Sequence, residues 1–127
     1  MQPQSAFSVR LGKYNPSSDK IIHFRHIVYN EQNHYSPQTG LFTCVIPGVY
    51  QFSFLCSAFV DVGSAELLHN NELVQHSFKV SEGGRYLSSG DAVLRLQTGD
   101  KVWLEATDGI TGLTTTSFFS GYLLFAV

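Results

Sequence analysis

Apolar and polar residues alternate with a period of two along most of the chain. This period is typical of β-strands that bury one face, and no segment shows a sustained helical period. Glycine, proline, asparagine and serine clusters interrupt the alternation. The predicted strands lie within residues 7–11, 21–30, 41–46, 50–56, 65–69, 72–80, 91–97, 101–106 and 117–127, and the predicted loops within 12–20, 31–40, 81–90 and 107–116. This pattern predicts an all-β, antiparallel sandwich or jelly roll.

Three short turns are expected to form hairpins. The first is at Pro47-Gly48, where alternating apolar residues flank the turn on both sides, and the second is at residues 98–100. The third is at Asn70-Asn71, although four apolar residues around it would also share one face of a helix: Leu67, Leu68, Leu73 and Val74. A central Asn-Asn pair is more typical of a hairpin loop than of a helix interior, so we favour the hairpin.

The last predicted strand is apolar on both faces. Phe119, Leu123 and Phe125 are expected to face the core. Phe118, Tyr122 and Leu124 are expected to face outward. Because the outer face of a sandwich strand normally meets water, a second apolar face indicates that another subunit covers it. We therefore predict that Phe118, Tyr122 and Leu124 form a subunit interface.

The composition is that of one globular domain. The 127 residues include only 14% charged residues and a net charge of −2, without a basic run, which argues against a nucleic-acid partner. No apolar run reaches the length of about 18 residues that membrane insertion requires, and the first ten residues contain no signal-type apolar stretch. Residues 1–5 are expected to be an N-terminal tail, with Met1 of the kind an expression vector supplies, and residues 6–127 the domain.

The two cysteines, Cys44 and Cys56, are expected to be free. In the hairpin that turns at Pro47-Gly48 they would lie about five residues apart along the strands, or roughly 17 Å. A disulfide requires Cα atoms within about 7 Å of each other. Buried thiols that act as small hydrophobic side chains are therefore the favoured interpretation.

Nothing in the sequence indicates catalysis or a cofactor. Serines are plentiful, but none lies in a nucleophile motif, and both cysteines are expected to point inward. The five histidines are His23, His26, His34, His69 and His76. The spacing of three between His23 and His26 places their side chains on opposite faces of a strand, so a shared metal site is not expected.

Eight positions match a specific pattern, and they are Phe24, Asn30, Tyr35, Phe42, Gly48, Tyr50, Phe52 and Phe54. Their residue types and fixed spacing match the signature of the C1q globular domain, and the segments "SSGDAVLRLQTGDKVWLEA" and "SFFSGYLLF" resemble later blocks of that family. The resemblance extends from Ala6 to Phe125. It implies a ten-stranded jelly roll of the C1q/tumour-necrosis-factor type, assembled as a homotrimer in a secreted, extracellular protein, often behind a collagen-like stalk.

The resemblance implies a non-enzymatic function, and two classes stay open. One is a recognition head, of the kind found in innate immunity, that binds a protein, receptor or surface glycan through its loops. The alternative is a structural domain that nucleates a collagen-like triple helix or a matrix network. Some family members bind calcium through loop carboxylates, but the corresponding loop here has Glu82 and no aspartate, so calcium is not expected. The loops expected to bind ligands are 12–20, 61–66, 81–86 and 107–115.

Overall fold

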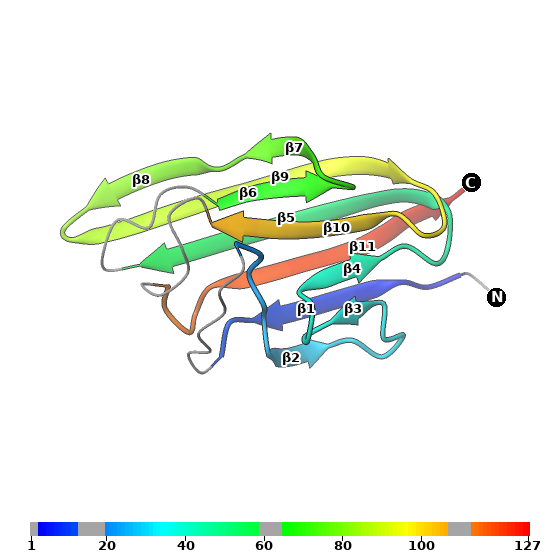
Figure 1. The fold of residues 1–127 in the computed structure, drawn as a ribbon, viewed down its shortest axis with the longest axis horizontal. Helices are drawn as coiled ribbons and strands as arrows, with labels where there is room; N and C mark the ends of the chain where they lie inside the picture. Colours follow the sequence, from blue (N-terminus) through cyan, green and yellow to red (C-terminus); the bar gives the residue numbers. More distant parts are fainter. Residues whose placement is uncertain (1–2, 13–19, 59–64, 107–112) are drawn as a thin grey trace.

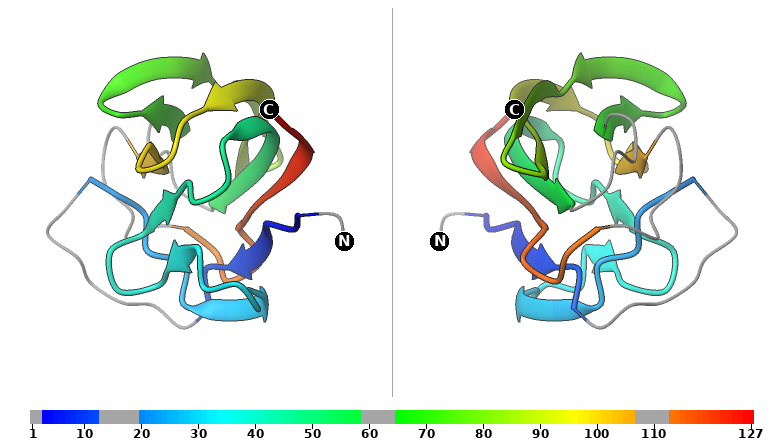
Figure 2. Two further views of the ribbon diagram at one scale, coloured as in Figure 1. Left: turned by 90° about the vertical axis from the view of Figure 1, so that its right-hand side faces the viewer. Right: turned by 90° about the vertical axis from the view of Figure 1, so that its left-hand side faces the viewer.

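Two antiparallel sheets pack face to face in the computed structural model, which describes residues 3–12, 20–58, 65–106 and 113–127 (Figures 1 and 2). The strands are β1 (Ala6–Arg10), β2 (His26–Tyr29), β3 (Tyr35–Ser36), β4 (Leu41–Thr43), β5 (Gly48–Ala58), β6 (Ala65–His69), β7 (Glu72–His76), β8 (Phe78–Glu82), β9 (Arg85–Leu96), β10 (Lys101–Ala106) and β11 (Phe118–Ala126). The six-stranded sheet has the order β2-β1-β11-β5-β9-β8, and the five-stranded sheet has the order β3-β4-β10-β6-β7. The predicted antiparallel jelly-roll sandwich is confirmed. The described residues contain no helix that could span a membrane.

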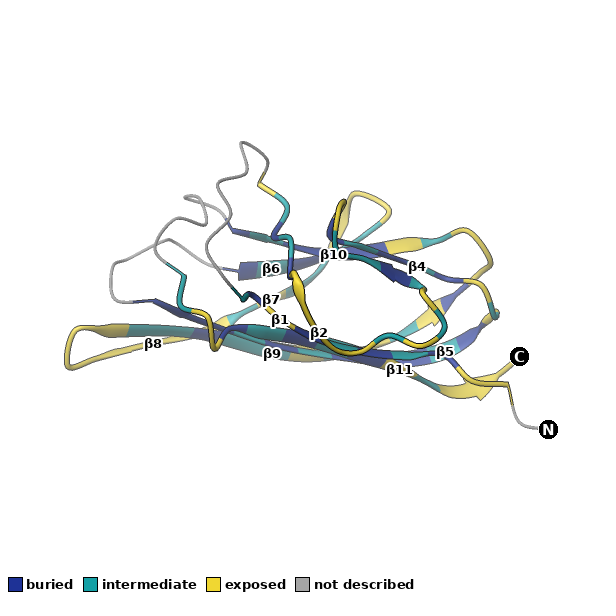
Figure 3. Ribbon diagram, turned by 90° about the horizontal axis from the view of Figure 1, so that it is seen from below, coloured by how far each residue is buried: buried dark blue, intermediate teal, exposed yellow. Residues whose placement is uncertain are grey.

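Strands β7 and β8 belong to different sheets although only Ser77 separates them. They form one bent strand that crosses from the five-stranded sheet to the six-stranded sheet. The eleven strand segments of the described chain therefore differ from the ten expected strands by this one bend. The β8–β9 hairpin extends past the end of β5 as an arm (Figures 1 and 3).

Two of the three predicted hairpins are wrong. The Pro47-Gly48 turn connects β4 with β5, but β4 pairs with β3 and β10 in one sheet, and β5 pairs with β9 and β11 in the other. The turn at residues 98–100 likewise connects β9 of one sheet to β10 of the other. Both turns are corners between the sheets. Alternation is the same on the two sides of a corner and of a hairpin, because in both cases the apolar side chains of both strands face the core.

The hairpin at Asn70-Asn71 is confirmed. It joins β6 and β7, and both asparagines have positive φ angles, 50° and 71°, as a tight two-residue hairpin turn requires. The loop predicted at 81–90 is wrong over most of its length. The turn there is limited to Gly83-Gly84, and the flanking residues pair as β8 and β9. The glycines and serines of this segment suggested a loop, but the pairing of β9 with β5 holds it in an extended conformation.

The space between the sheets is filled with aromatic rings. Those with at most 2% exposure are Phe7, Phe24, Tyr35, Phe42, Tyr50, Phe52, Phe54 and Phe119. Phe7 has its ring centroid 5.1 Å from that of Tyr35, 5.3 Å from that of Phe42 and 4.9 Å from that of Phe119, so these rings form one contiguous cluster. Each fully buried aromatic side chain stabilises the fold by roughly 1.5–3 kcal/mol through loss of hydrated apolar surface.

Glycines in the neighbouring strands provide room for these rings. Gly121 lies opposite Phe52, and a Cβ at this glycine would lie 2.5 Å from the Phe52 ring. Gly90 lies opposite Phe54 in the same way, with 2.9 Å to that ring. The inner face of the six-stranded sheet thus pairs large rings with glycines across adjacent strands, because two large side chains would not fit between the layers.

Hydrogen bonds between residues of the C1q-like signature connect the segment after β2 to β3. The Asn30 side chain accepts from the Tyr35 backbone N–H (3.3 Å) and donates to the Tyr35 carbonyl (2.7 Å). The Tyr35 hydroxyl in turn accepts from the backbone N–H of Phe24 (3.0 Å). Asn30 therefore fixes the strand that carries Tyr35. The signature therefore specifies the hydrogen bonds between Asn30 and Tyr35 as well as the packing of the core aromatic side chains.

The two thiols are free and buried, as predicted, but not for the predicted reason. Cys44 continues from β4 in one sheet, whereas Cys56 lies in β5 of the other sheet. Burial raises the pKa of both thiols, and that of Cys56 to about 12. The Cys44 thiol also donates to the Ile46 carbonyl over 3.2 Å. Neither thiol has the character of a nucleophile.

Candidate assembly face

The outer surface of the six-stranded sheet carries a set of apolar side chains that the described chain leaves partly or largely exposed. Its members are Phe118, Tyr122, Leu124 and Phe125 of β11, Leu55 of β5, Val93 of β9, and Phe78 and Val80 of β8. We call this set the open face. Cross-strand register brings the members together: Phe118 lies opposite Leu55, and Leu55 and Phe78 lie opposite the same residue, Ser89.

Several of these side chains are strongly exposed. Phe78 is 73% exposed, Val93 60% and Tyr122 46%, although these residue types are normally buried. A polar row crosses the middle of the face, in which Asp91, Ser53 and Ser120 lie opposite one another on β9, β5 and β11. Figure 3 shows the contrast between the buried interior of this sheet and its exposed outer edge strands.

The structure places the predicted interface residues of β11 on this face. Phe118 is partly buried, and Tyr122 and Leu124 are exposed, while Phe119 and Leu123 pack on the core. The role of Phe118, Tyr122 and Leu124 as subunit contacts stays a prediction. The missed members, Phe78, Val80 and Val93, belong to the same alternating pattern.

The prediction for Phe125 is wrong. The alternation places its side chain on the core, but in the structure it is 58% exposed. The register with β5 shifts between Leu123 and Phe125, because Leu123 lies opposite Tyr50 and Phe125 lies opposite the next residue, Val49. Leu124 is the extra residue of this bulge. A bulge of one residue moves every following side chain to the other face.

A hollow of about 500 Å³ lies on the open face, beside the bend between β7 and β8. Phe78, Phe118 and Leu55 provide its apolar walls, and Asp91 and Ser53 provide its polar side. The hollow exists because the bent strand pairs with β9 only from residue 78 onward and leaves the rest of that edge uncovered. It makes the open face concave enough to receive side chains of another chain.

The outer surface of the five-stranded sheet is different, because its groups pair with one another. His76 Nδ1 lies 3.0 Å from Glu66 Oε2 on the adjacent strand. The Trp103 indole N–H donates to Glu105 over 3.0 Å, and the Trp103 side chain is only 6% exposed. These polar groups therefore have partners within the chain.

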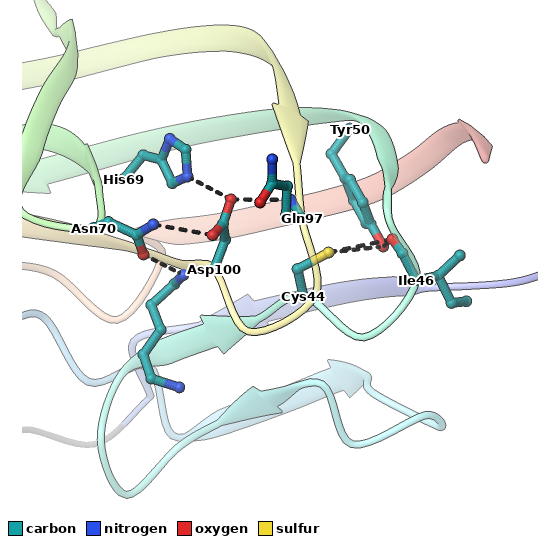
Figure 4. A network of polar contacts seen from close by, with 8 residues as sticks. Cys44, Ile46, Tyr50, His69, Asn70, Gln97 and Asp100 are labelled. Atoms are coloured by element: carbon teal, nitrogen blue, oxygen red, sulfur yellow. Dashed lines mark hydrogen bonds and ion pairs between the residues drawn. The ribbon is translucent and has the colours of Figure 1, made fainter. Parts of the chain in front are cut away.

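A polar network centred on Asp100 joins three turns at one end of the molecule (Figure 4). They are the β6–β7 turn at Asn70-Asn71, the β9–β10 turn at residues 98–100 and the β4–β5 turn that follows Cys44. One carboxylate oxygen lies 2.9 Å from His69 Nε2 and accepts from the Gln97 backbone N–H, and the other accepts from the Asn70 side chain. These contacts lower the pKa of Asp100, chiefly through the hydrogen bond from the Gln97 backbone. Cys44 extends the connection, because its N–H donates to the Asp100 carbonyl. The network fixes the corners where the chain changes sheets.

Ser5 and His34 form a hydrogen-bonded pair, with 2.7 Å between Ser5 Oγ and His34 Nδ1. Serine beside histidine is the beginning of a nucleophilic site, but Ser5 is only 3% exposed. Burial also lowers the pKa of His34, which favours the neutral ring that accepts from the serine hydroxyl. The Ser5 carbonyl accepts from the Leu123 N–H. This pair holds the segment before β1 against the sandwich.

The described residues contain no group of three histidine, cysteine, aspartate or glutamate side chains arranged to hold a metal ion. His69 and His76 each contact a carboxylate instead, Asp100 and Glu66 respectively. Of the loops expected to bind ligands, the ranges 13–19, 61–64 and 107–112 lie outside the described residues. The range 81–86 is the tip of the β8–β9 arm.

The sequence profile of the C1q domain family matches residues 6–124. The chain belongs to the C1q domain family. The match includes all eight positions of the predicted signature, so the resemblance that they indicated is confirmed.

Individual comparisons agree with this assignment. Protein HP-25 homolog 1 of Bos taurus is 37% identical over 126 residues, which cover 96% of this chain and 59% of that protein. The collagen alpha-1(X) chain of Mus musculus is also 37% identical, over 96% of this chain and 19% of its own length. The globular domain of zebrafish complement 1qA protein superposes with a TM-score of 0.79 at 27% identity and covers 97% of this chain and 99% of that one. The chain thus spans less than two thirds of the curated relatives named here.

Proposed function

We propose that this C1q domain is the homotrimeric, non-enzymatic head of a secreted protein and that it binds its ligands through loops. The open face is the observation that carries the proposal. It holds large apolar side chains at high exposure on a sheet whose inner face is already packed, and a monomer in water would present them as an aggregation-prone patch. Assembly removes this surface from water and leaves the loops accessible.

Three subunits are favoured by the kinship with a collagen chain. A collagen triple helix winds three chains, so a globular domain attached to such a chain is present in three copies around one axis. A three-fold arrangement requires two different patches of each subunit to meet, because only a two-fold axis joins a patch to itself. The open face offers two such patches, the β8–β9 arm on one side and β11 on the other.

A recognition role is supported by the resemblance to the globular domain of complement 1qA. Binding residues in sandwiches of this type lie on loops that a rigid scaffold positions. The scaffold here is tied together at one end, because the Asp100 network joins three turns and the Asn30 contacts hold the β2–β3 connection. We propose a protein, receptor or surface-glycan ligand and an extracellular location.

A structural role is the second candidate, and the collagen alpha-1(X) relative favours it. In that case trimer formation itself is the function, because it would align three collagen-like chains. The two candidates differ in what precedes the domain. A Gly-x-y repeat directly upstream in the precursor favours the structural role, and a precursor without one favours a free ligand.

Absence of catalysis is part of the proposal. It is supported by the buried thiols with raised pKa values and by the burial of Ser5 beside His34. No metal or calcium is proposed as a cofactor.

Sedimentation equilibrium tests the trimer directly. At micromolar concentration we expect a single species of three times 14.1 kDa. A monomer at every concentration would contradict the proposal. A dimer would show that the open face is self-complementary and would also contradict it.

A further inference from the structure

Both sheets end in a short strand on the same side of the sandwich. β2 is the last strand of the six-stranded sheet, and β3 is the last strand of the five-stranded sheet. Residues 30–34 connect them directly, so the two edges stay close together (Figure 1). Each strand has a paired neighbour on one side only, β1 for β2 and β4 for β3.

Ile27 shows that the core is incomplete on this side. It lies opposite Val9 in β1, and Val9 is completely buried on the inner face of the sheet. Cross-strand partners share a face, so Ile27 also belongs to the inner face. It is nevertheless 41% exposed. An inward-facing isoleucine at such exposure means that the described chain leaves part of its core surface uncovered here.

A cavity of about 380 Å³ occupies this opening, a volume within the range of ligand pockets. Its apolar surface comes from Ile27 and Pro37, with the Tyr35 ring buried behind them. Its polar rim comes from Asn33, Ser36 and Gln38. None of the described residues that line it is a lysine, arginine, aspartate or glutamate, so this lining offers no group that would select a charged ligand.

The amides of the rim differ in what they already bind. Asn30, which also lines the cavity, uses both ends of its side chain on the backbone of Tyr35. The Asn33 side chain makes no hydrogen bond within the described part of the chain. The Gln38 oxygen accepts from the Ser36 hydroxyl, but its NH₂ group has no partner among the described residues. Two primary amides at the rim are therefore available to a ligand.

We propose that this cavity, which we call the edge cavity, binds a short extended peptide segment of a partner protein. An aliphatic side chain of the peptide occupies the space next to Ile27 and completes the core. Asn33 and Gln38 bind the flanking peptide groups, because a primary amide offers both a donor and an acceptor to a backbone amide. The proposal rests on the recognition role above but not on the trimer.

Two features of the edge cavity favour a short peptide segment over a glycan or a long added strand. A glycan normally stacks on an exposed aromatic ring, but the one aromatic ring among the described lining residues, Tyr35, is 1% exposed. A long added strand is also disfavoured, since the register of β2 with β1 shifts at Val28 and interrupts regular pairing at the edge. The edge cavity therefore fits one side chain and its two neighbouring peptide groups.

The test uses the purified protein and a minimal probe, N-acetyl-leucine N-methylamide, which carries one aliphatic side chain between two peptide groups. The δ1 methyl signal of Ile27 and the side-chain amide signals of Asn33 and Gln38 are followed by NMR during titration. We expect saturable shifts at these three residues and none at the methyl of Ile46, which precedes the corner between β4 and β5 and does not line the cavity. N-acetylglycine N-methylamide lacks the side chain and should bind at least about tenfold more weakly, because burying a leucine contributes roughly 1.5 kcal/mol or more.

Two variants sharpen the test. Asn33→Gly removes the side-chain amide but keeps a residue that accepts the positive φ of 60°. It should lower the affinity for the leucine probe about fivefold, which is the effect of losing one hydrogen bond. Asn71→Gly is the matched control, because Asn71 has a φ of 71° in the β6–β7 turn, and it should leave binding unchanged. Ile27→Trp fills the edge cavity and should abolish the shifts of the two amides.

Three results would overturn the proposal. They are equal binding of the leucine and glycine probes, shifts that appear on the open face instead, and signals of Ile27 that depend on protein concentration without any probe. The last result would mean that a second copy of this chain occupies the edge. The trimer proposal is judged separately by sedimentation, so a monomer that still binds the leucine probe at Ile27 would refute only the trimer.

Discussion

The two outer surfaces of the sandwich are built from the same alternating pattern but differ in how far their large side chains are covered. On the five-stranded sheet, Trp103 is covered and bonded to Glu105, and His76 contacts Glu66. On the six-stranded sheet, large side chains such as Phe78 and Val93 have no cover. The side chains named on the first surface have partners within the chain, whereas those named on the second are left exposed by a single subunit.

This difference shows where to look for function in a sandwich. Exposure of single apolar residues is common on any protein surface, but a set of large apolar residues on the same face of four neighbouring strands is not. The edge cavity is a third case, since it exposes an inner-face residue. The predictions below test whether the two surfaces differ in the way that we describe, from the largest expected effect to the smallest.

A charge on the open face should have the largest effect. Tyr122→Asp places one carboxylate per subunit in a surface that assembly removes from water, and unpaired buried charges cost on the order of several kcal/mol. We expect loss of the trimer in sedimentation while the β-sheet circular dichroism signal remains. Leu73→Asp is the control, because Leu73 is equally exposed, at 45%, but lies on the five-stranded sheet. A Tyr122→Asp protein that stays trimeric with wild-type stability would place the interface elsewhere.

Substitution by valine should lower the free energy of unfolding much more on the inner side of β11 than on its outer side. At Gly121 a valine would lie within 2.5 Å of the Phe52 ring, and we expect Gly121→Val to lower the free energy of unfolding by about 3 kcal/mol, the upper range for overpacked cores. At Ser120, one residue earlier and on the outer side, the same valine should change it by less than about 0.5 kcal/mol. Denaturant unfolding of both variants measures the difference. Similar losses would mean that β11 has a different register.

The polar network at the turns should give a smaller, pH-dependent effect. Asp100→Asn removes a charge that three donors stabilise, and we expect a loss of about 1 kcal/mol at pH 7. Because the pKa of Asp100 is lowered in the folded state, its contribution is present above the unfolded pKa of about 4 and disappears as the pH falls through the folded value. The difference from the wild type should therefore vanish in acid. Asp91→Asn on the open face is the control, since that carboxylate has no hydrogen bond within the described residues, and the substitution should leave the free energy of unfolding at pH 7 nearly unchanged.

The thiols should show no reaction in the native protein. Cys44 and Cys56 lie in the shared interior of the two sheets, and their raised pKa values keep them protonated at pH 8. Alkylation followed by mass spectrometry should modify neither residue before denaturation and both after it, without reducing agent. Modification of the native protein would show that the interior opens. A mass that stays unchanged after denaturation would reveal a disulfide.

The sequence predicted those features that depend on neighbours along the chain. The Asn70-Asn71 hairpin is local, because the turn residues themselves favour positive φ angles. The core aromatic residues follow from alternation, and the C1q family assignment follows from the fixed spacing of eight residues such as Asn30 and Tyr35. The outward positions of Phe118 and Tyr122 in the candidate assembly face could also be predicted.

The features that depend on which strands meet could not be predicted locally. The turns at Pro47 and Gly99 were interpreted as hairpins because a corner between sheets produces the same alternation. Phe125 lies on the outer face because one extra residue, Leu124, bulges from the pairing with β5. The alternation of apolar and polar residues does not reveal such a bulge. The edge cavity likewise arises only when β2 and β3 come to lie at the same side of two different sheets.

The sequence by itself thus determined most of the strands, most of the core residues and the family, because period-two burial is a property of each strand alone. The tertiary structure decided which sheet each strand joins, which face Phe125 occupies and where the interior stays open beside Ile27. These outcomes depend on hydrogen bonds between strands that are distant in the sequence, such as β11 with both β1 and β5. The partner of a strand is set by the packing of the whole sandwich, and the residues of that strand alone do not specify it.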